Sequence, residues 1–140
     1  TTIVLSRERA SQGLYPAIDP LQSESKMLMP HIVGQHHYAV ARGVRQTLAG
    51  YEDLKDVIAM LGLEELSRAD RRVVNRARRL ERFLTQPFFT TEQFTGQSGR
   101  LVPLDDVLEG CERILADEFI DYPEQALYMV GGVDEAARKE

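Results

Sequence analysis

The stretch LGLEELSRADRRVVNRARRLERFLTQPFFTTEQF, residues 61–94, decides the fold of this chain. Gly62 can end a preceding helix, because glycine tolerates a left-handed backbone. Ser67 and Asp70 have the spacing of a capping box at the start of a new helix. The apolar residues that follow share one helical face: Val73, Val74, Ala77, Leu80, Phe83 and Leu84. Pro87 lacks a backbone N–H, so the sequence predicts that this helix ends before it.

A second amphipathic run precedes this one. Apolar residues recur every three or four positions through residues 33–61, which predicts a helix of roughly 40 Å. Gly43 and Gly50 lie inside it, and we expect close packing or a bend at both. Because the connection is so short, the two helices should run nearly antiparallel, with residues 64–70 as a charged tip that points away from the body.

The rest of the chain is also mainly helical in pattern. Residues 1–5 are apolar and β-branched, which indicates one strand that has no partner in this chain. Residues 13–20 form an extended loop, because its two prolines block a helix. The sequence further predicts a helix over 104–115, one or two helical turns over 124–130 and a last helix over 133–140. The predicted fold is all-α, a helical bundle with one long hairpin and a single strand before it.

Composition limits the class of protein. A length of 140 residues fits one domain. A net charge of -5 argues against nucleic acid as a general partner, and no apolar run is long enough for a membrane span. The single cysteine, Cys111, cannot form an internal disulfide, which fits a reducing compartment. The chain does not begin with Met, so we expect an excised fragment or a processed chain.

No catalytic constellation follows from the residues alone. None of the ten glycines belongs to a phosphate-binding loop. His31, His36 and His37 lack the spacing of a helical metal pair, so we expect no metal site. Cys111 lies on an apolar helical stripe and is expected in the core. The isolated chain is therefore not expected to catalyse a reaction.

The second helix of the hairpin is rich in arginine, with Arg71, Arg72, Arg76, Arg78, Arg79 and Arg82. One interpretation is a free-standing helical module that binds nucleic acid through this face. The other is a solvated face whose charges pair with nearby acids: Glu52, Asp53, Glu64, Glu65 and Glu81. The acidic balance of the whole chain favours the second.

Aromatic residues leave a further alternative open. Phe88, Phe89 and Phe94 stand in a polar loop, where they either plug the core or face a flat ligand. Tyr15 precedes a proline and is held extended. Taken alone, it is interpreted as a packed surface aromatic.

Six blocks of sequence carry a resemblance to a known family. They are GLYPAIDP at 13–20, VGQHHYAVARGVRQTL at 33–48, LGLEELSRAD at 61–70, RARRLERFLTQPFF at 76–89, FTG at 94–96 and PEQALYMVGG at 123–132. Together the chain resembles the C-terminal part of the catalytic beta subunit of rotary F-type ATP synthases. The resemblance implies a helical domain over residues 13–140, with residues 1–12 as the end of a nucleotide-binding core that is missing here.

The resemblance also implies a function for the full subunit. That function is ATP synthesis or hydrolysis coupled to ion transport, with ATP or ADP and Mg as ligands. The implied partners are alpha subunits and the rotating gamma subunit of the central stalk. The implied location is the cytoplasmic face of an energy-transducing membrane.

Two groups of site residues follow from the resemblance. The adenine pocket of the catalytic site would be formed by Tyr15, Pro16, Phe88, Phe94 and Thr95. A non-catalytic nucleotide site at the alpha interface would receive Tyr38 and Arg42.

The tip of the hairpin matches the family's contact with the central stalk. Its residues here are Glu64, Glu65, Leu66, Ser67, Arg68, Ala69 and Asp70. The family usually has five acids in this stretch, whereas this tip has three acids and one base, a formal charge of -2. This difference weakens an electrostatic lever, whereas steric pushing by a stiff hairpin survives it.

Overall fold

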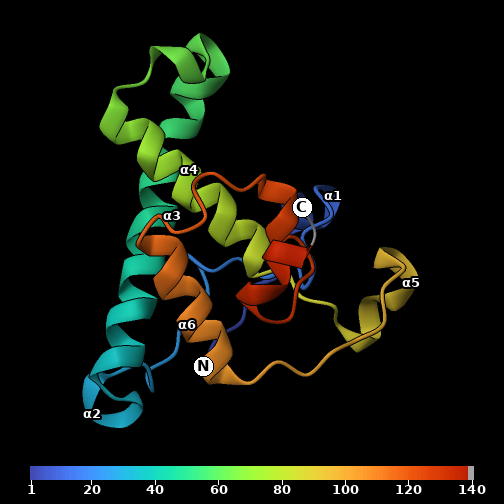
Figure 1. Ribbon diagram of the computed structural model, residues 1–140. Helices are drawn as coiled ribbons and strands as arrows, with labels where there is room; N and C mark the ends of the chain where they lie inside the picture. Colours follow the sequence, from blue (N-terminus) through green and yellow to red (C-terminus); the bar gives the residue numbers. More distant parts are fainter. Residues whose placement is uncertain (139–140) are drawn as a thin grey trace.

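The computed structural model describes residues 1–138, and helices dominate it, as predicted (Figure 1). Two long helices, α3 (Gln35–Leu61) and α4 (Arg68–Phe83), run antiparallel and are joined at a tip that contains the 3-10 helix η1 (Leu63–Glu65). Helix α6 (Leu104–Leu115) packs against both arms. The short elements are α1 (Arg7–Ser11), α2 (Pro30–Val33), η2 (Phe89–Thr91), α5 (Glu92–Thr95), η3 (Glu124–Leu127) and η4 (Val133–Arg138).

The predicted helix ends of the hairpin are confirmed. Gly62 follows α3 with a φ of +84°, and its N–H donates to the Ile58 carbonyl at 2.9 Å. The Ser67 hydroxyl accepts the N–H of Asp70 at 3.1 Å and so caps α4. The first arm begins at Gln35 rather than at 33, because Gly34, with a φ of +91°, separates it from α2.

Both glycines inside α3 lie at close helix–helix contacts, as expected. A β-carbon at Gly43 would lie 3.1 Å from Cδ1 of Leu115 on α6. At Gly50 it would lie 3.3 Å from Cγ1 of Val73 on α4. The missing side chains therefore let α6 and α4 approach the first arm.

The core lies between the two arms, α6 and the C-terminal 3-10 turns. Its largest fully buried side chains are Phe83, Leu80, Ile114, Leu127, Val74 and Val130. Four of them come from the predicted stripe of α4 and the predicted helix over 104–115. Cys111 is 3% exposed within this core, as expected.

The N-terminal segment differs from its prediction. Residues 1–5 form no continuous strand, and they do have partners: Thr2 bridges to Glu24 and Leu5 bridges to Ile18. Helix α1 was not predicted, and it starts where the Ser6 hydroxyl accepts the N–H of Arg9 at 3.3 Å. Pairing with the loop that follows α1 thus ties this segment to the helical body.

The C-terminal elements are tighter than ordinary helices. Residues 124–127 and 133–138 form 3-10 turns, and residues 139 and 140 of the predicted last helix lie outside the described residues. Within residues 1–138, no helix has the length and apolar character needed to span a lipid bilayer.

Candidate functional site

The aromatic loop, residues 87–100, leaves the body after α4 and carries the three phenylalanines. Phe88, Phe89 and Phe94 are 44%, 61% and 72% exposed, so the interpretation that they plug the core is wrong. The buried phenylalanine at this end of α4 is Phe83, and the loop with α5 stands away from the bundle (Figure 1). These rings are therefore accessible to a ligand or to another surface.

Tyr15 and Phe94 stack on each other. Their ring centroids lie 5.8 Å apart, with an angle of 13° between the ring planes. The Gln86 N–H donates to the Tyr15 carbonyl at 3.1 Å, which fixes Tyr15 beside the end of α4. Among the described residues, no aromatic contact joins Phe88 to either ring. The structure thus brings together two of the three rings expected at the flat-ligand site.

The two other residues of the expected pocket lie next to this pair. A cis peptide bond joins Tyr15 to Pro16, and Pro16 lines a hollow of about 210 Å³ beside the end of α4. The Thr95 hydroxyl donates to the Thr91 carbonyl at 3.2 Å and accepts the N–H of Gln97 at 3.3 Å. Thr95 therefore also shapes the backbone of the aromatic loop.

Hydrogen bonds close the aromatic loop on itself. The Arg100 N–H donates to the Pro87 carbonyl at 2.8 Å, and the Gly99 N–H donates to Oε1 of Glu92 at 2.7 Å. The Phe89 ring packs directly on Gly99, where a β-carbon would lie 2.4 Å from it. These contacts give an exposed loop a defined shape.

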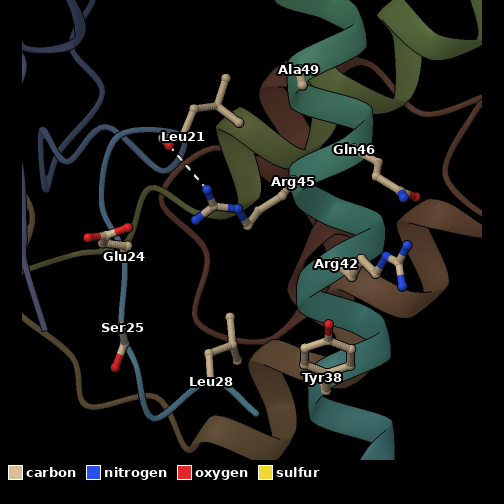
Figure 2. Close-up of a pocket in the computed structure, with 9 residues that line it drawn as sticks. All are labelled: Leu21, Glu24, Ser25, Leu28, Tyr38, Arg42, Arg45, Gln46 and Ala49. Carbon is tan, nitrogen blue, oxygen red and sulfur yellow. Dashed lines mark hydrogen bonds between the residues drawn. The ribbon is translucent and has the colours of Figure 1, made fainter. Parts of the chain in front are cut away.

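A second hollow, of about 480 Å³, lies between α3 and the loop of residues 21–28 (Figure 2). Tyr38 and Arg42, the two residues predicted for the non-catalytic nucleotide site, both line it. Arg45 crosses to the loop and donates to the carbonyls of Ser23 at 2.8 Å and Leu21 at 3.1 Å, whereas the Arg42 guanidinium points away from the loop (Figure 2). Sequence reasoning missed Arg45; its place one helical turn from Arg42 was the available signal.

The hairpin tip is stabilised by contacts within the hairpin itself. Leu66 is buried, whereas most of the polar residues of the tip are exposed. The Arg71 guanidinium donates to the carbonyls of Leu63 and Glu64, so a side chain of α4 supports the turn. Met60 and Leu61 are exposed beside the tip, an apolar surface that sequence reasoning missed.

The arginines of α4 are engaged within the domain, but mostly not with the predicted acids. Arg76 pairs with Asp117 at 2.6 Å and Arg78 with Glu124 at 3.0 Å. Arg79 donates to three backbone carbonyls of the segment after α6: Phe119, Ile120 and Tyr122. The expected pairing with Glu52, Asp53, Glu64, Glu65 and Glu81 is wrong, because this face of α4 packs against residues 117–124 rather than against solvent.

Glu81 has a different environment from the other acids. It is buried, and the guanidinium of Arg9 on α1 lies 3.4 Å from its carboxylate. Burial raises the pKa of Glu81, and the charges of Arg9 and Lys55 oppose that rise. This pair joins the N-terminal segment to the second arm of the hairpin.

Potential metal ligands and nucleophiles are not clustered in the described part of the chain. There, no group of three or more His, Cys, Asp or Glu side chains is gathered to hold a metal ion. His36 instead lies 3.0 Å from Glu112 at the surface. Burial raises the pKa of the Cys111 thiol to about 12, so it is not a nucleophile at neutral pH.

Comparison with known proteins decides the family. Residues 26–122 match the family described as the C-terminal domain of V and A type ATP synthase. The chain belongs to this family.

Individual relatives confirm the resemblance to the beta subunit. The chain is 72% identical over 138 residues to ATP synthase subunit beta 1 of Marinomonas sp. (strain MWYL1), covering 99% of this chain and 28% of that relative. It is 71% identical over 138 residues to ATP synthase subunit beta 2 of Albidiferax ferrireducens, covering 99% and 27%. It is 69% identical over 135 residues to ATP synthase subunit beta of Acaryochloris marina, covering 96% and 30%. This C-terminal domain thus spans less than a third of the length of these relatives.

Proposed function

We propose that this domain supplies the base-binding side of the catalytic nucleotide site of an ATP synthase beta subunit. The observation that carries the proposal is the parallel stack of Tyr15 and Phe94, two exposed or half-buried rings from distant parts of the chain. A purine is flat and apolar on its faces, so two parallel aromatic rings match its shape. Stacking of this kind contributes about 0.5–1.5 kcal/mol beyond the burial of area.

The spacing of the two rings defines how a base would enter. A base that touches both faces needs about 3.5 Å on each side, so about 7 Å in all between the rings. The present centroid distance is 5.8 Å, and the gap between the ring planes is no larger than this, so Phe94 has to move outward by at least about an ångström. Phe94 lies on the one-turn helix α5 of an exposed loop, whereas Tyr15 is anchored at α4. Pro16, Phe88 and Thr95 would line the slot beside the base.

The phosphates of ATP or ADP and the Mg²⁺ ion would be held elsewhere in the full subunit. The residues that would form the slot are Tyr15, Pro16, Phe88, Phe94 and Thr95, and none of them carries a positive charge for phosphate. The purified 140-residue chain should therefore neither hydrolyse ATP nor bind it tightly. Steady-state hydrolysis by the chain alone would contradict this assignment.

Tyr38 and Arg42 would serve a second, non-catalytic nucleotide site shared with an alpha subunit. Their support is the hollow of about 480 Å³ along α3. Arg45 holds the loop of residues 21–28, which forms one side of the hollow, by donating hydrogen bonds to the carbonyls of Leu21 and Ser23. Arg42 lies beside this open hollow and its guanidinium points away from the loop. This arrangement suits a nucleotide site that a neighbouring subunit completes.

Residues 64–70 would transmit force between the beta subunit and the gamma subunit of the central stalk. Two packed arms and the internal support of Leu66 and Arg71 make the hairpin stiff. A tip of charge -2 supplies little long-range attraction, so we propose steric pushing as the mechanism. The assembly would lie at the cytoplasmic face of an energy-transducing membrane, with ATP turnover coupled to ion transport.

Nucleotide titration of the assembled ATP synthase tests the base site. Tyr15→Ala should raise the Kd for MgATP about tenfold, because a stacking surface is lost. Tyr15→Phe keeps the ring and should stay near the wild-type value. Cys111→Ser, a substitution in the core away from the slot, should weaken binding less than Tyr15→Ala. Equal affinities for the Ala and Phe variants would contradict the proposal.

A further inference from the structure

Arg100 and Glu135 connect the aromatic loop to the last described turn of the chain. Nη1 of Arg100 donates to Oε2 of Glu135 at 2.6 Å, and Nη2 donates to Oε1. Two parallel hydrogen bonds of this kind fix the direction as well as the distance of the guanidinium. Glu135 also accepts the Gly131 N–H at 3.3 Å, which orients its carboxylate.

The guanidinium of Arg100 also rests on the protein backbone. A β-carbon at Gly131 would lie 2.8 Å from Cζ and from Nη2 of Arg100. Gly131 follows Val130, which is fully buried in the core. Arg100 is thus held against a fixed part of the domain, although its side chain is 48% exposed and that of Glu135 is 27% exposed.

Arg100 is also the residue that closes the aromatic loop. Its N–H donates to the Pro87 carbonyl at 2.8 Å, so the two ends of the loop meet at this residue. Phe94 lies between these ends on α5 and is highly exposed. The position of its ring therefore depends on how the loop is held at its ends.

We propose that Arg100 and Glu135 are positioning residues of the nucleotide site. Their ion pair holds the aromatic loop in the place that sets Phe94 parallel to Tyr15. Neither residue touches the base in this account, and the inference rests on the proposed base site. Exposed ion pairs contribute little to global stability, so the main effect of losing this one falls on nucleotide affinity.

Assembled ATP synthase with Arg100→Gln tests the pair. The Kd for MgATP should rise about threefold to fivefold, with kcat per assembled complex changing less than Kd. Arg72→Gln is the matched control, because Arg72 is an exposed arginine on the hairpin arm α4 that pairs with Asp117 at 3.9 Å and involves neither the aromatic loop nor η4. Its Kd should equal that of the wild type.

The double variant Arg100→Gln with Phe94→Ala separates positioning from a structural role. If Arg100 acts by positioning Phe94, the double variant binds no more weakly than Phe94→Ala alone. Independent, additive losses would overturn the positioning role, and so would lower kcat or assembly at an unchanged Kd. If Tyr15→Ala raises Kd and Arg100→Gln does not, the positioning role of the Arg100–Glu135 pair is overturned and the proposed base site stands. If neither variant changes Kd, both the positioning role and the proposed base site are overturned.

Discussion

The Arg76 guanidinium binds the Asp117 carboxylate through two hydrogen bonds, Nε to Oδ1 and Nη2 to Oδ2, each 2.6 Å long. Arg76 lies on α4 and Asp117 on the turn that follows α6, where it adopts a φ of +63°. The pair is partly buried. It locks the second arm of the hairpin to the helix packed across it.

Asp117→Asn should destabilise the 140-residue chain. Asparagine tolerates a positive φ, so the backbone is kept while the charge is lost. Hydrogen bonds to charged groups contribute about 1.5–3 kcal/mol, and we expect a loss near the lower end from urea unfolding. Asp134→Asn is the control, because Asp134 is 84% exposed and its loss should cost under about 0.5 kcal/mol. Equal losses would contradict the role of the pair.

The same pair predicts a dependence on pH. The hydrogen bond from Arg76 lowers the pKa of Asp117 in the folded chain below its ordinary value. A depressed pKa contributes stability above the unfolded pKa, about 3.9, and that stability is lost as pH falls through the folded pKa. The difference between wild type and Asp117→Asn should therefore shrink below about pH 4. A difference that stays constant from neutral to strongly acidic pH would exclude this explanation.

Gly110→Ala should destabilise the domain although alanine favours helix. A β-carbon at Gly110 would lie 2.2 Å from Cζ of Phe83, which is fully buried. Overpacking of this kind costs about 1–3 kcal/mol. Gly132→Ala is the matched control, because within residues 1–138 no atom other than those of Gly132 and its two chain neighbours is found within 4 Å of its β-carbon position. Thermal or urea unfolding measures both, and a stabilised Gly110→Ala variant would contradict the packing.

Arg9→Gln and Glu81→Gln should have unequal effects on stability. Burial raises the pKa of Glu81, so its ionised form is disfavoured in the fold, and stability from this group falls as pH rises through the folded pKa. Glu81→Gln removes that charge and should change stability by less than about 1 kcal/mol. Arg9→Gln leaves the carboxylate without its ion pair and should cost about 1–3 kcal/mol at neutral pH. Urea unfolding at pH 7 tests this order, and the reverse order would refute it.

The Cys111 thiol should be unreactive in the folded chain. Burial raises its pKa to about 12, so almost no thiolate exists at pH 8. A disulfide reagent should label it only after denaturation. Rapid stoichiometric labelling of the native chain would show that the core around α6 is open.

Much of the hairpin was predictable because its signals are local. Gly62, Ser67 and the apolar stripe of α4 act over one or two helical turns, and a sequence displays such spacings directly. The short helix α1 was missed although Ser6 has the chemistry of a cap, because five residues give no periodicity.

The partners of the α4 arginines were not predictable in the same way. We expected the arginines to pair with acids of the hairpin itself. Asp117 and Glu124 are instead brought next to them by the packing of α6 and η3 against α4. The exposure of Phe88 and Phe89 likewise depends on the loop leaving the body at Pro87. Tyr15 and Phe94, by contrast, were expected together from the resemblance alone, and the structure places them in contact.

The most direct test of the base site places a fluorescent reporter in the slot. The chain has no tryptophan, so Phe94→Trp in the assembled ATP synthase adds one indole at the stack. Titration with ATP should change the emission of the introduced indole with a saturable dependence on nucleotide, because the base stacks on the ring. An emission that stays constant while ATP binds the complex would contradict the account.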